Sequence, residues 1–246
     1  MNLHHTKGIV LRTVKYGETS VIVTIFTELF GIQSYLVNGV RTSAKKGSGK
    51  ANLFQPSAIL DMVVYYNELK QLQRIKEFKW AHIYNHVLSD VVKNAVALFM
   101  IELLTKCLKQ PEANPDLFHF AEDALLSLDI ASDTVTANFP LFFALHLPVF
   151  FGLRISDNYS ETNSFLDLQE GAFVKDHPQH PHFLEDKQSF ITSQILKVQH
   201  PAEMEDIKLN HDFRRQLLFR YEVYYKLQIQ DFGTLKTLPV LREILG

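Results

Sequence analysis

The feature that most constrains this chain is a change in the spacing of its apolar residues near Trp80. Before Trp80, β-branched and aromatic residues form short runs of strand length, of which SVIVTIFT, Ser20–Thr27, is the clearest. After it, apolar residues recur every three or four positions, which is typical of one face of a helix. This change predicts an α+β chain, with a β domain over residues 1–80 and a mainly α-helical domain over residues 81–246.

Five strands are predicted in the first domain, at residues 7–14, 20–27, 32–37, 58–66 and 69–78. Between the third and fourth lies NGVRTSAKKGSGKAN, residues 38–52, which has no apolar periodicity and is rich in Gly, Ser and Lys. Such a segment is predicted to be an exposed loop. Because a small open sheet exposes unpaired edge strands, we expect the five strands to close into a barrel.

The second domain is predicted to contain helices that bury their apolar faces on one another. Asn114 is a suitable N-terminal cap for one of them, with Pro115 at the first helical position. The pair Asn138 and Pro140 has the same pattern and predicts the start of another helix, over residues 141–151.

Residues 153–187 interrupt the helical pattern and are predicted to be a small irregular insert with two short β segments, 165–168 and 171–174. The insert ends in a proline-stiffened connector, HPQHPHF, and the longest helix follows at about residues 210–230. We expect no metal in the insert, because structural zinc usually has four ligands, often thiolates. Here the prolines separate the three histidines of the connector, which are His177, His180 and His182.

Several function classes are disfavoured by the residues themselves. The N-terminus lacks the apolar segment of a secretory signal, and no membrane span is predicted, so we expect a cytoplasmic protein. AKKGSGKA, residues 44–51, lacks the first glycine and the final hydroxyl of a phosphate-binding P-loop. Cys107, the only cysteine, lies in an apolar helical stretch and is expected to be a small core residue. We therefore predict no enzyme activity and no cofactor.

Charge is distributed unevenly between the two domains. Residues 1–80 contain 11 basic and five acidic side chains, a formal charge of +6, and the remaining 14 basic and 22 acidic side chains give −8. A basic segment within an acidic chain predicts a polyanionic partner for that segment. Binding would release counterions and would be sensitive to salt. The predicted phosphate contacts are four cations of the exposed loop, Arg41, Lys45, Lys46 and Lys50, together with Arg12 and Lys15 at the first turn, which would extend the same track.

Barrel proteins that bind single strands also use aromatic rings as surfaces for base stacking. Tyr35 is the predicted ring, with Phe30 and Phe54 as further candidates. The alternative is that each ring belongs to the core and that the basic loop is only a solvated segment.

A second group of cations lies near the C-terminal end, at Lys208, Arg214, Arg215 and Arg220. Three interpretations stay open for it. The group is a solvated helix face, a second phosphate contact, or a docking site for an acidic peptide of a partner protein.

The order of these features resembles the bacterial recombination-mediator family RecO. The resemblance is carried by KGIVLRTVKYGETSVIVTIFTELFGIQSYLVNGVRT and FQPSAILDMVVYY in the first domain. It continues through PEANPDLFHFAEDALLSLD and reaches RRQLLFRYEVYYKLQIQDFGTLKTLPVLREIL at the end of the chain. No single motif is specific, but their order is, and it covers nearly the whole chain.

The resemblance implies an OB-fold barrel followed by a helical domain. It implies binding of single- and double-stranded DNA, annealing of complementary strands, and recombinase loading in gap repair, in the cytoplasm at the nucleoid. The implied partners are RecR, single-strand-binding protein and, indirectly, the recombinase RecA. DNA contacts of the family would match Arg12, Arg41, Lys45, Lys46 and Lys50 here. Many relatives carry a four-cysteine zinc module after the position of Gly152, whereas this insert has no cysteine.

A rival hypothesis is a protein-binding adaptor, in which the acidic helical domain acts and the barrel is a spacer. An enzyme that uses the insert as its active site is a third hypothesis, disfavoured by the missing ligand set. Binding of an oligonucleotide at low and high salt separates the first two.

Overall fold

The computed structural model describes residues 2–40 and 50–245. It forms two compact units, each described here by itself. The barrel unit comprises residues 1–85 and 108–125, and the helical unit comprises residues 86–107 and 126–246. The barrel unit thus includes a segment that follows the first helix of the chain, beyond the predicted boundary at residue 80.

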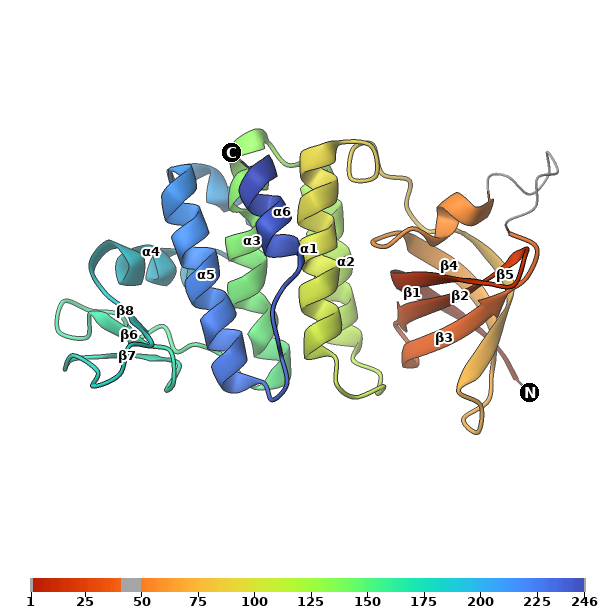
Figure 1. Cartoon of the computed structure of the whole chain (residues 1–246), viewed down its shortest axis with the longest axis horizontal. Coiled ribbons are helices and arrows are strands. Elements are labelled where there is room, and N and C mark those ends of the chain that lie inside the picture. The colour runs from red at the N-terminus through yellow and green to blue at the C-terminus, as the bar shows by residue number, and fades with distance from the viewer. Residues whose placement is uncertain (1, 41–49, 246) are drawn as a thin grey trace. The chain divides into compact units, whose positions relative to one another are not determined.

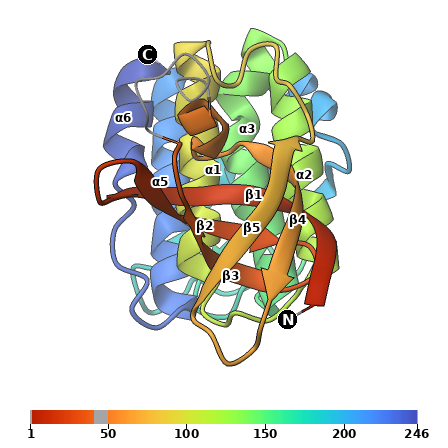
Figure 2. The same ribbon diagram turned by 90° about the vertical axis from the view of Figure 1, so that its right-hand side faces the viewer.

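The barrel is built from β1 (Asn2–Tyr16), β2 (Ser20–Thr27), β3 (Gly31–Val37), β4 (Ile59–Tyr66) and β5 (Leu72–Trp80). The strands close in the order β1-β2-β3-β5-β4, as the views in Figures 1 and 2 show. All neighbours are antiparallel except β3 and β5, which pair in parallel through three residues of each strand. The predicted five-stranded OB-fold barrel is confirmed.

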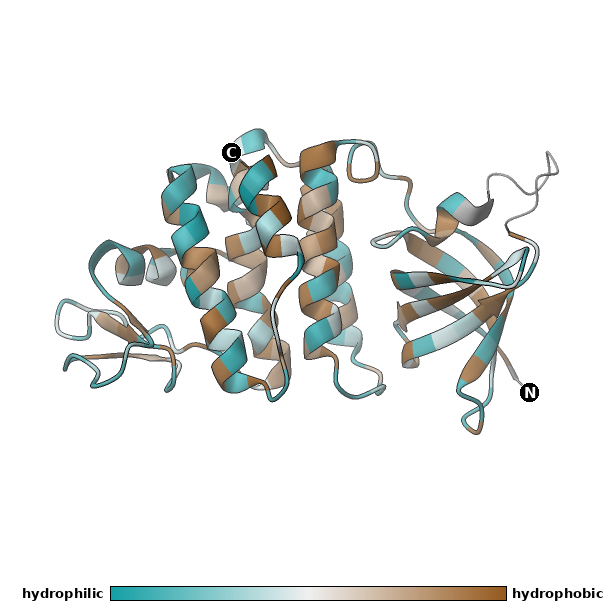
Figure 3. Cartoon of the chain, viewed as in Figure 1, coloured by the Kyte–Doolittle hydropathy of each residue, from teal (hydrophilic) through white to brown (hydrophobic). Residues whose placement is uncertain are grey.

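The interior of the barrel is filled by every second side chain of its strands. Val21, Val23 and Ile25 of β2 point inward, because alternate side chains of a strand face opposite sides of a sheet. Figure 3 shows the resulting change between apolar and polar residues along the strands. The core cluster also takes in residues of the other strands and of the short helix η1 (Lys50–Phe54), among them Tyr35, Val37, Phe54, Leu60, Met62 and Val64.

The segment 108–125 packs closely on the barrel. Gly31 opens β3 with a φ of +62°, and a Cβ at this position would lie 2.0 Å from the carbonyl oxygen of Pro111. The rings of Phe26 and Phe118 are 5.7 Å apart, and the Lys7 ammonium donates to Glu122 at 2.8 Å. Only glycine permits this backbone approach, since any side chain would occupy the space of the neighbouring carbonyl.

The helices of the chain are α1 (Val91–Cys107), α2 (Pro115–Ile130), α3 (Asp133–His146), α4 (Asp186–Lys197), α5 (His211–Gln228) and α6 (Thr237–Ile244). Short turns of 3₁₀ helix are η2 (Leu147–Phe151) and η3 (Pro201–Asp206). The predicted cap Asn114 accepts from the backbone N–H of Leu117, and Asn210, at the start of the predicted longest helix, caps α5 by accepting from the backbone N–H of Phe213.

The predicted start of a helix at Asn138 and Pro140 is wrong. Helix α3 begins at Asp133, capped by the Ser132 hydroxyl, which accepts from the backbone N–H of Val135. Pro140 lies inside the helix. Proline removes one backbone hydrogen bond there, but most of α3 is buried, so its packing outweighs that loss.

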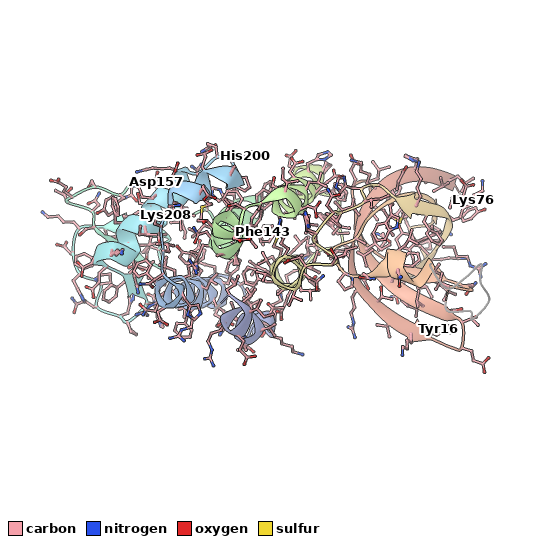
Figure 4. The ribbon with its side chains drawn as sticks, turned by 90° about the horizontal axis from the view of Figure 1, so that it is seen from above. Tyr16, Lys76, Phe143, Asp157, His200 and Lys208 are labelled. Carbon is pink, nitrogen blue, oxygen red and sulfur yellow. The ribbon has the colours of Figure 1, made fainter. Side chains whose placement is uncertain are left out.

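Residues Asp133–Phe151 are long and apolar enough, by length and composition alone, to span a membrane, although no span was predicted from the sequence. In the helical unit 67% of the window is buried against other parts of the protein, so the segment serves as a core helix. Figure 4 shows Phe143, which belongs to α3, surrounded by side chains.

Three short strands form the insert: β6 (Phe165–Asp167), β7 (Ala172–Val174) and β8 (Phe183–Leu184), in the order β7-β6-β8. The two β segments predicted at 165–168 and 171–174 are therefore confirmed.

Candidate nucleic-acid interface

Half of the six predicted phosphate contacts fall outside the described part of the chain. These are Arg41, Lys45 and Lys46. Lys50 opens η1, but its side chain is not described. Arg12 and Lys15 are both exposed on β1.

Arg12 and Lys15 lie on different faces of their strand. Arg12 pairs with Thr24 of β2, while Lys15 pairs with Val21, which points into the barrel core. Because paired residues share a face, Arg12 lies on the outer surface and Lys15 is on the inward side at the end of β1. The two cations therefore do not form one continuous track along the strand.

Tyr35, the predicted stacking ring, is completely buried at 0% exposure and belongs to the barrel core. Its position on β3 alternates with outward residues, so its ring fills the core and is not available to stack on a base. Burial raises the pKa of its hydroxyl, which has no hydrogen-bond partner among the described residues. Phe54 is buried as well, and Phe30 stacks on Tyr66 with ring centroids 4.1 Å apart.

Several barrel cations are compensated by acids. Lys7 pairs with the buried Glu122 at 2.8 Å, and the hydrogen bond that its ammonium donates to this carboxylate raises the pKa of Lys7. Asp61 contacts both His5, at 2.6 Å, and Lys79, at 3.2 Å. Each acid reduces the positive potential beside it, so this side of the barrel is a poor site for a phosphate chain.

Within residues 1–80, four described cations have no ion-pair partner among the residues that the structure covers. We call these the unpaired cations, and they are Arg12, Lys15, Lys70 and Arg74. Lys70 and Arg74 were missed in the sequence, because they belong to the predicted fifth strand and its turn and carry no motif. The barrel therefore has paired cations, whose positive potential is reduced by a neighbouring acid, and unpaired cations, whose positive potential is available to attract an anionic ligand.

Three of the four cations near the C-terminal end line a groove between α5 and α6. The groove has a volume of about 960 Å³, and Arg214, Arg215 and Arg220 line it. Arg242 of α6 lines it too and was missed, because it is distant in sequence from the other arginines. Apolar side chains complete the groove, among them Leu218, Phe219, Leu235, Leu238 and Leu241. We call this site the arginine groove.

The arginines of the groove are held in different ways. Arg214 is half-buried and donates to the carbonyl of Leu209 at 2.7 Å, and desolvation lowers its pKa. Its Nε has no partner among the described residues. Arg215 contacts Asp212 at 3.3 Å. Lys208 is not part of the groove lining, and its ammonium donates to the backbone carbonyl of Glu205 at 2.6 Å.

A hydrogen-bonded pair holds the connector of the insert. The Asp167 carboxylate lies 3.1 Å from Nε2 of His180 and accepts from the backbone N–H of Gln169 at 2.8 Å. Nδ1 of His180 accepts from the backbone N–H of His182 at 3.2 Å. In the described residues no three His, Cys, Asp or Glu side chains converge on a possible ion site.

Comparison with known proteins identifies relatives over the whole length of the chain. Models of the recombination protein O N-terminal and C-terminal domains match residues 1–84 and 88–160. A DNA repair protein RecO of Bacteroides fragilis is 32% identical over 243 residues, covering 98% of this chain and 99% of the relative. Proteins of the same name from Christiangramia forsetii and Phocaeicola vulgatus are 32% and 31% identical over 244 residues, covering 99% of this chain and 100% of each relative.

Proposed function

The chain belongs to the RecO family of DNA repair proteins, and from this premise we propose that it is a non-catalytic recombination mediator. It binds single- and double-stranded DNA, anneals complementary strands and helps to load a recombinase in gap repair. Residues 1–80 contact DNA, and residues 81–246 serve partner proteins.

The observation that carries this proposal is the presence of unpaired cations on the barrel. Among the described residues, Arg12, Lys15, Lys70 and Arg74 have no acidic partner, whereas Lys7 and Lys79 form ion pairs with Glu122 and Asp61. The basic loop, with Arg41, Lys45, Lys46 and Lys50, adds four more cations in the sequence that leads from β3 to η1.

Annealing needs no covalent chemistry in this proposal. Two DNA strands repel each other through their phosphates, and cations that neutralise part of this charge lower the barrier to their encounter. Base pairing then selects the complementary strand, while the protein supplies only electrostatic screening and proximity.

The test replaces Lys45, Lys46 and Lys50 with Glu. We expect annealing to be lost, and oligonucleotide affinity to become weaker and less dependent on salt, because each lost contact with a single strand removes about 0.7 from the slope of log K against log salt. A matched control reverses three exposed lysines of the helical unit, Lys175, Lys187 and Lys197. Unchanged DNA affinity of the loop variant in the salt titration would refute the assignment.

The partners proposed from the family resemblance are RecR and single-strand-binding protein, with RecA served indirectly. The corresponding experiment measures annealing of strands coated with single-strand-binding protein, with and without RecR. We expect the coated strands to anneal, and RecA filament formation on them to need both this protein and RecR.

A second candidate function, docking of a partner protein, is favoured by the arginine groove. A groove lined by both apolar side chains and arginines suits a segment that combines acidic and apolar residues. A peptide that alternates Asp with Leu should bind at low salt and lose most of its affinity in the variant Arg242→Glu. Equal binding of a peptide with the same composition of Lys and Leu would argue against this function.

A further inference from the structure

Helix α6 is held by hydrogen bonds at its N-terminal end. The Glu102 carboxylate of α1 accepts from the backbone N–H groups of Lys236 and Thr237, both at 2.8 Å, and from the Thr237 hydroxyl at 2.7 Å. Just upstream, Glu222 of α5 accepts from the backbone N–H of Leu235 at 2.8 Å. These bonds fix the segment that enters α6, which Figure 1 shows returning from the far end of α5.

The rest of α6 is packed less tightly than its neighbours. Among its eight residues, all of which the structure describes, only Leu241 is buried, whereas α5 buries six. Val240 is 47% exposed. Arg242 and Glu243, the charged side chains of α6, form no ion pair with another described residue. Because a helix of this length is not stable in water by itself, α6 depends on the place where Leu241 packs.

A groove lies along each side of α6. The arginine groove is lined by Leu238, Leu241 and Arg242 of this helix. A second groove, of about 330 Å³, is lined by Val240 and Ile244 of α6 and by side chains in and just before α1, among them Leu88, Val91, Ala95 and Leu98. Since neither side is filled by a neighbouring element, the side chains of α6 lack many of the dispersion contacts that hold a core helix in place.

The first turn of α6 depends on α1 for its hydrogen bonds. Lys236, the N-cap residue, makes no side-chain hydrogen bond of its own to the helix. Backbone N–H groups at the start of a helix have no partner within it, and here Glu102 supplies the acceptors. Glu102 therefore marks the point about which α6 can move while the preceding segment stays in place.

We propose that α6 opens and closes as a unit, independently of α1 and α5, and that its closed position completes the arginine groove. Elements with few buried apolar contacts open at a lower free energy than the whole domain unfolds. Opening removes Leu238 and Arg242 from the groove, while Arg214 and Arg215 remain on α5. A ligand that contacts both helices binds only the closed state and shifts the equilibrium toward it. The inference rests on the second candidate function, since it names a conformational control of the same groove.

The experiment measures how fast buried thiols of the full-length protein react with iodoacetamide. Leu241→Cys places a thiol on the buried side of α6, and Leu217→Cys makes the same substitution at a fully buried position of α5. The native Cys107, which is buried in α1, reports global unfolding in both variants, and peptide mass spectrometry separates the thiols. We expect the introduced thiol of Leu241→Cys to react at least about a hundredfold faster than that of Leu217→Cys.

Hydrogen exchange of the unmodified protein checks the same opening without a substitution in the core. The backbone amides of α6 should exchange faster than those of α1 and α5. Adding Glu102→Gln removes an acceptor oxygen from the start of α6. It should speed the alkylation of Leu241→Cys about tenfold and leave that of Leu217→Cys unchanged.

The peptide that alternates Asp with Leu tests the control of the groove. At about ten times its dissociation constant it should slow the alkylation of Leu241→Cys about tenfold, because it binds only the closed state. The peptide of the same composition with Lys in place of Asp is the control and should not slow the reaction.

The outcomes separate this inference from the function on which it rests. Equal alkylation of the two introduced thiols, with equal hydrogen exchange of α5 and α6, overturns independent opening. Peptide binding that leaves the alkylation of Leu241→Cys unchanged overturns the control of the groove by α6. If the peptide does not bind at all, the second candidate function fails together with that control, and the ratio of the two alkylation rates still decides whether α6 opens.

Discussion

The barrel surface that carries Arg12 and Arg74 and the arginine groove both combine arginines with apolar side chains, but their shapes differ. Arg12 and Arg74 lie on the outside of a closed sheet, where Val14, Ile22 and Leu36 occupy paired positions on neighbouring strands. The groove is a concavity of about 960 Å³ that is lined by four arginines and several leucines. A surface of the first kind suits a flexible polyanion that can lie across it, and one of the second kind suits a short protein segment that inserts apolar side chains.

The arginines of the two regions also differ in how far they are buried. Arg74 is exposed, while Arg214 in the groove is half-buried and has a pKa lowered by desolvation. A partly desolvated cation interacts more strongly with a single acid and is screened less by salt than an exposed one. The barrel is therefore expected to be the more salt-sensitive of the two sites.

The largest expected effect comes from crossed charge reversals. Arg12→Glu should weaken single-stranded DNA binding about tenfold or more and leave binding of an acidic peptide unchanged, because the peptide site is elsewhere. Arg220→Glu should do the opposite. Fluorescence titrations of both ligands against both variants form the test. If either variant weakened both ligands equally, the two regions would share one electrostatic role.

The next effect concerns the support of the barrel surface. Gly31→Ala should lower the free energy of unfolding by about 3 kcal/mol, because the backbone has a φ of +62° and the methyl group would meet the Pro111 carbonyl. Gly17→Ala is the control, with a φ of +59° and no atom within 4 Å of the added carbon, and should cost about 1 kcal/mol. Urea denaturation measures both. Equal losses of unfolding free energy in the two variants would show that the close contact between Gly31 and segment 108–125 adds nothing to the cost of the substitution.

A smaller effect tests whether a compensated cation takes part in DNA binding. Lys7→Gln should lower the free energy of unfolding by about 1 kcal/mol, since Lys7 is partly exposed and solvent screens its pair with Glu122. DNA affinity should stay within about twofold, because this charge is already neutralised. A tenfold loss of DNA affinity in Lys7→Gln would show that a paired cation also contributes to DNA binding.

The pH dependence of the same pair has a defined sign. Glu122 raises the pKa of Lys7 above its ordinary value of 10.5, so the pair stabilises the folded state at neutral pH and loses this contribution as the pH rises through the raised pKa. The difference in unfolding free energy between the unmodified protein and Glu122→Gln should therefore shrink above about pH 10.5. A difference that is constant from pH 8 to pH 12 would contradict the assignment.

The smallest effect is expected at Tyr35. Tyr35→Phe removes a buried hydroxyl without a hydrogen-bond partner and should leave stability unchanged or raise it by up to about 1 kcal/mol. DNA binding should not change, because the ring is in the core. Thermal denaturation and oligonucleotide binding together check this, and a loss of affinity would return Tyr35 to the DNA site.

The sequence was sufficient to predict the barrel and most of its strands, because runs such as Ser20–Thr27 have a strong strand pattern. It was misleading at Tyr35, where residue type suggested a stacking surface, although Tyr35 lies two positions from Val37, on the same inward face of β3, and its ring belongs to the core. Pro140 misled in a similar way, since its usual position at a helix start was outweighed by tertiary packing of α3.

The composition of the sites could not be predicted, because it depends on pairings between distant segments. Leu36 and Arg74 become neighbours only through the parallel pairing of β3 with β5, and Arg242 joins Arg214 only when α6 packs beside α5. The assignment of Lys7 to the compensated cations required Glu122, which is 115 residues away. Such contacts follow from the fold and leave no local pattern in the sequence.

The parallel pairing of β3 and β5 joins only three residues of each strand, against seven or eight in the pairings of β2 with β3 and of β1 with β4. This short seam is where the cylinder closes, and Leu36 and Arg74 sit on either side of it. A ligand that contacted both residues would hold β3 and β5 together at this short pairing. Because such a ligand would bind only the closed barrel, its binding would raise the free energy needed to separate the two strands.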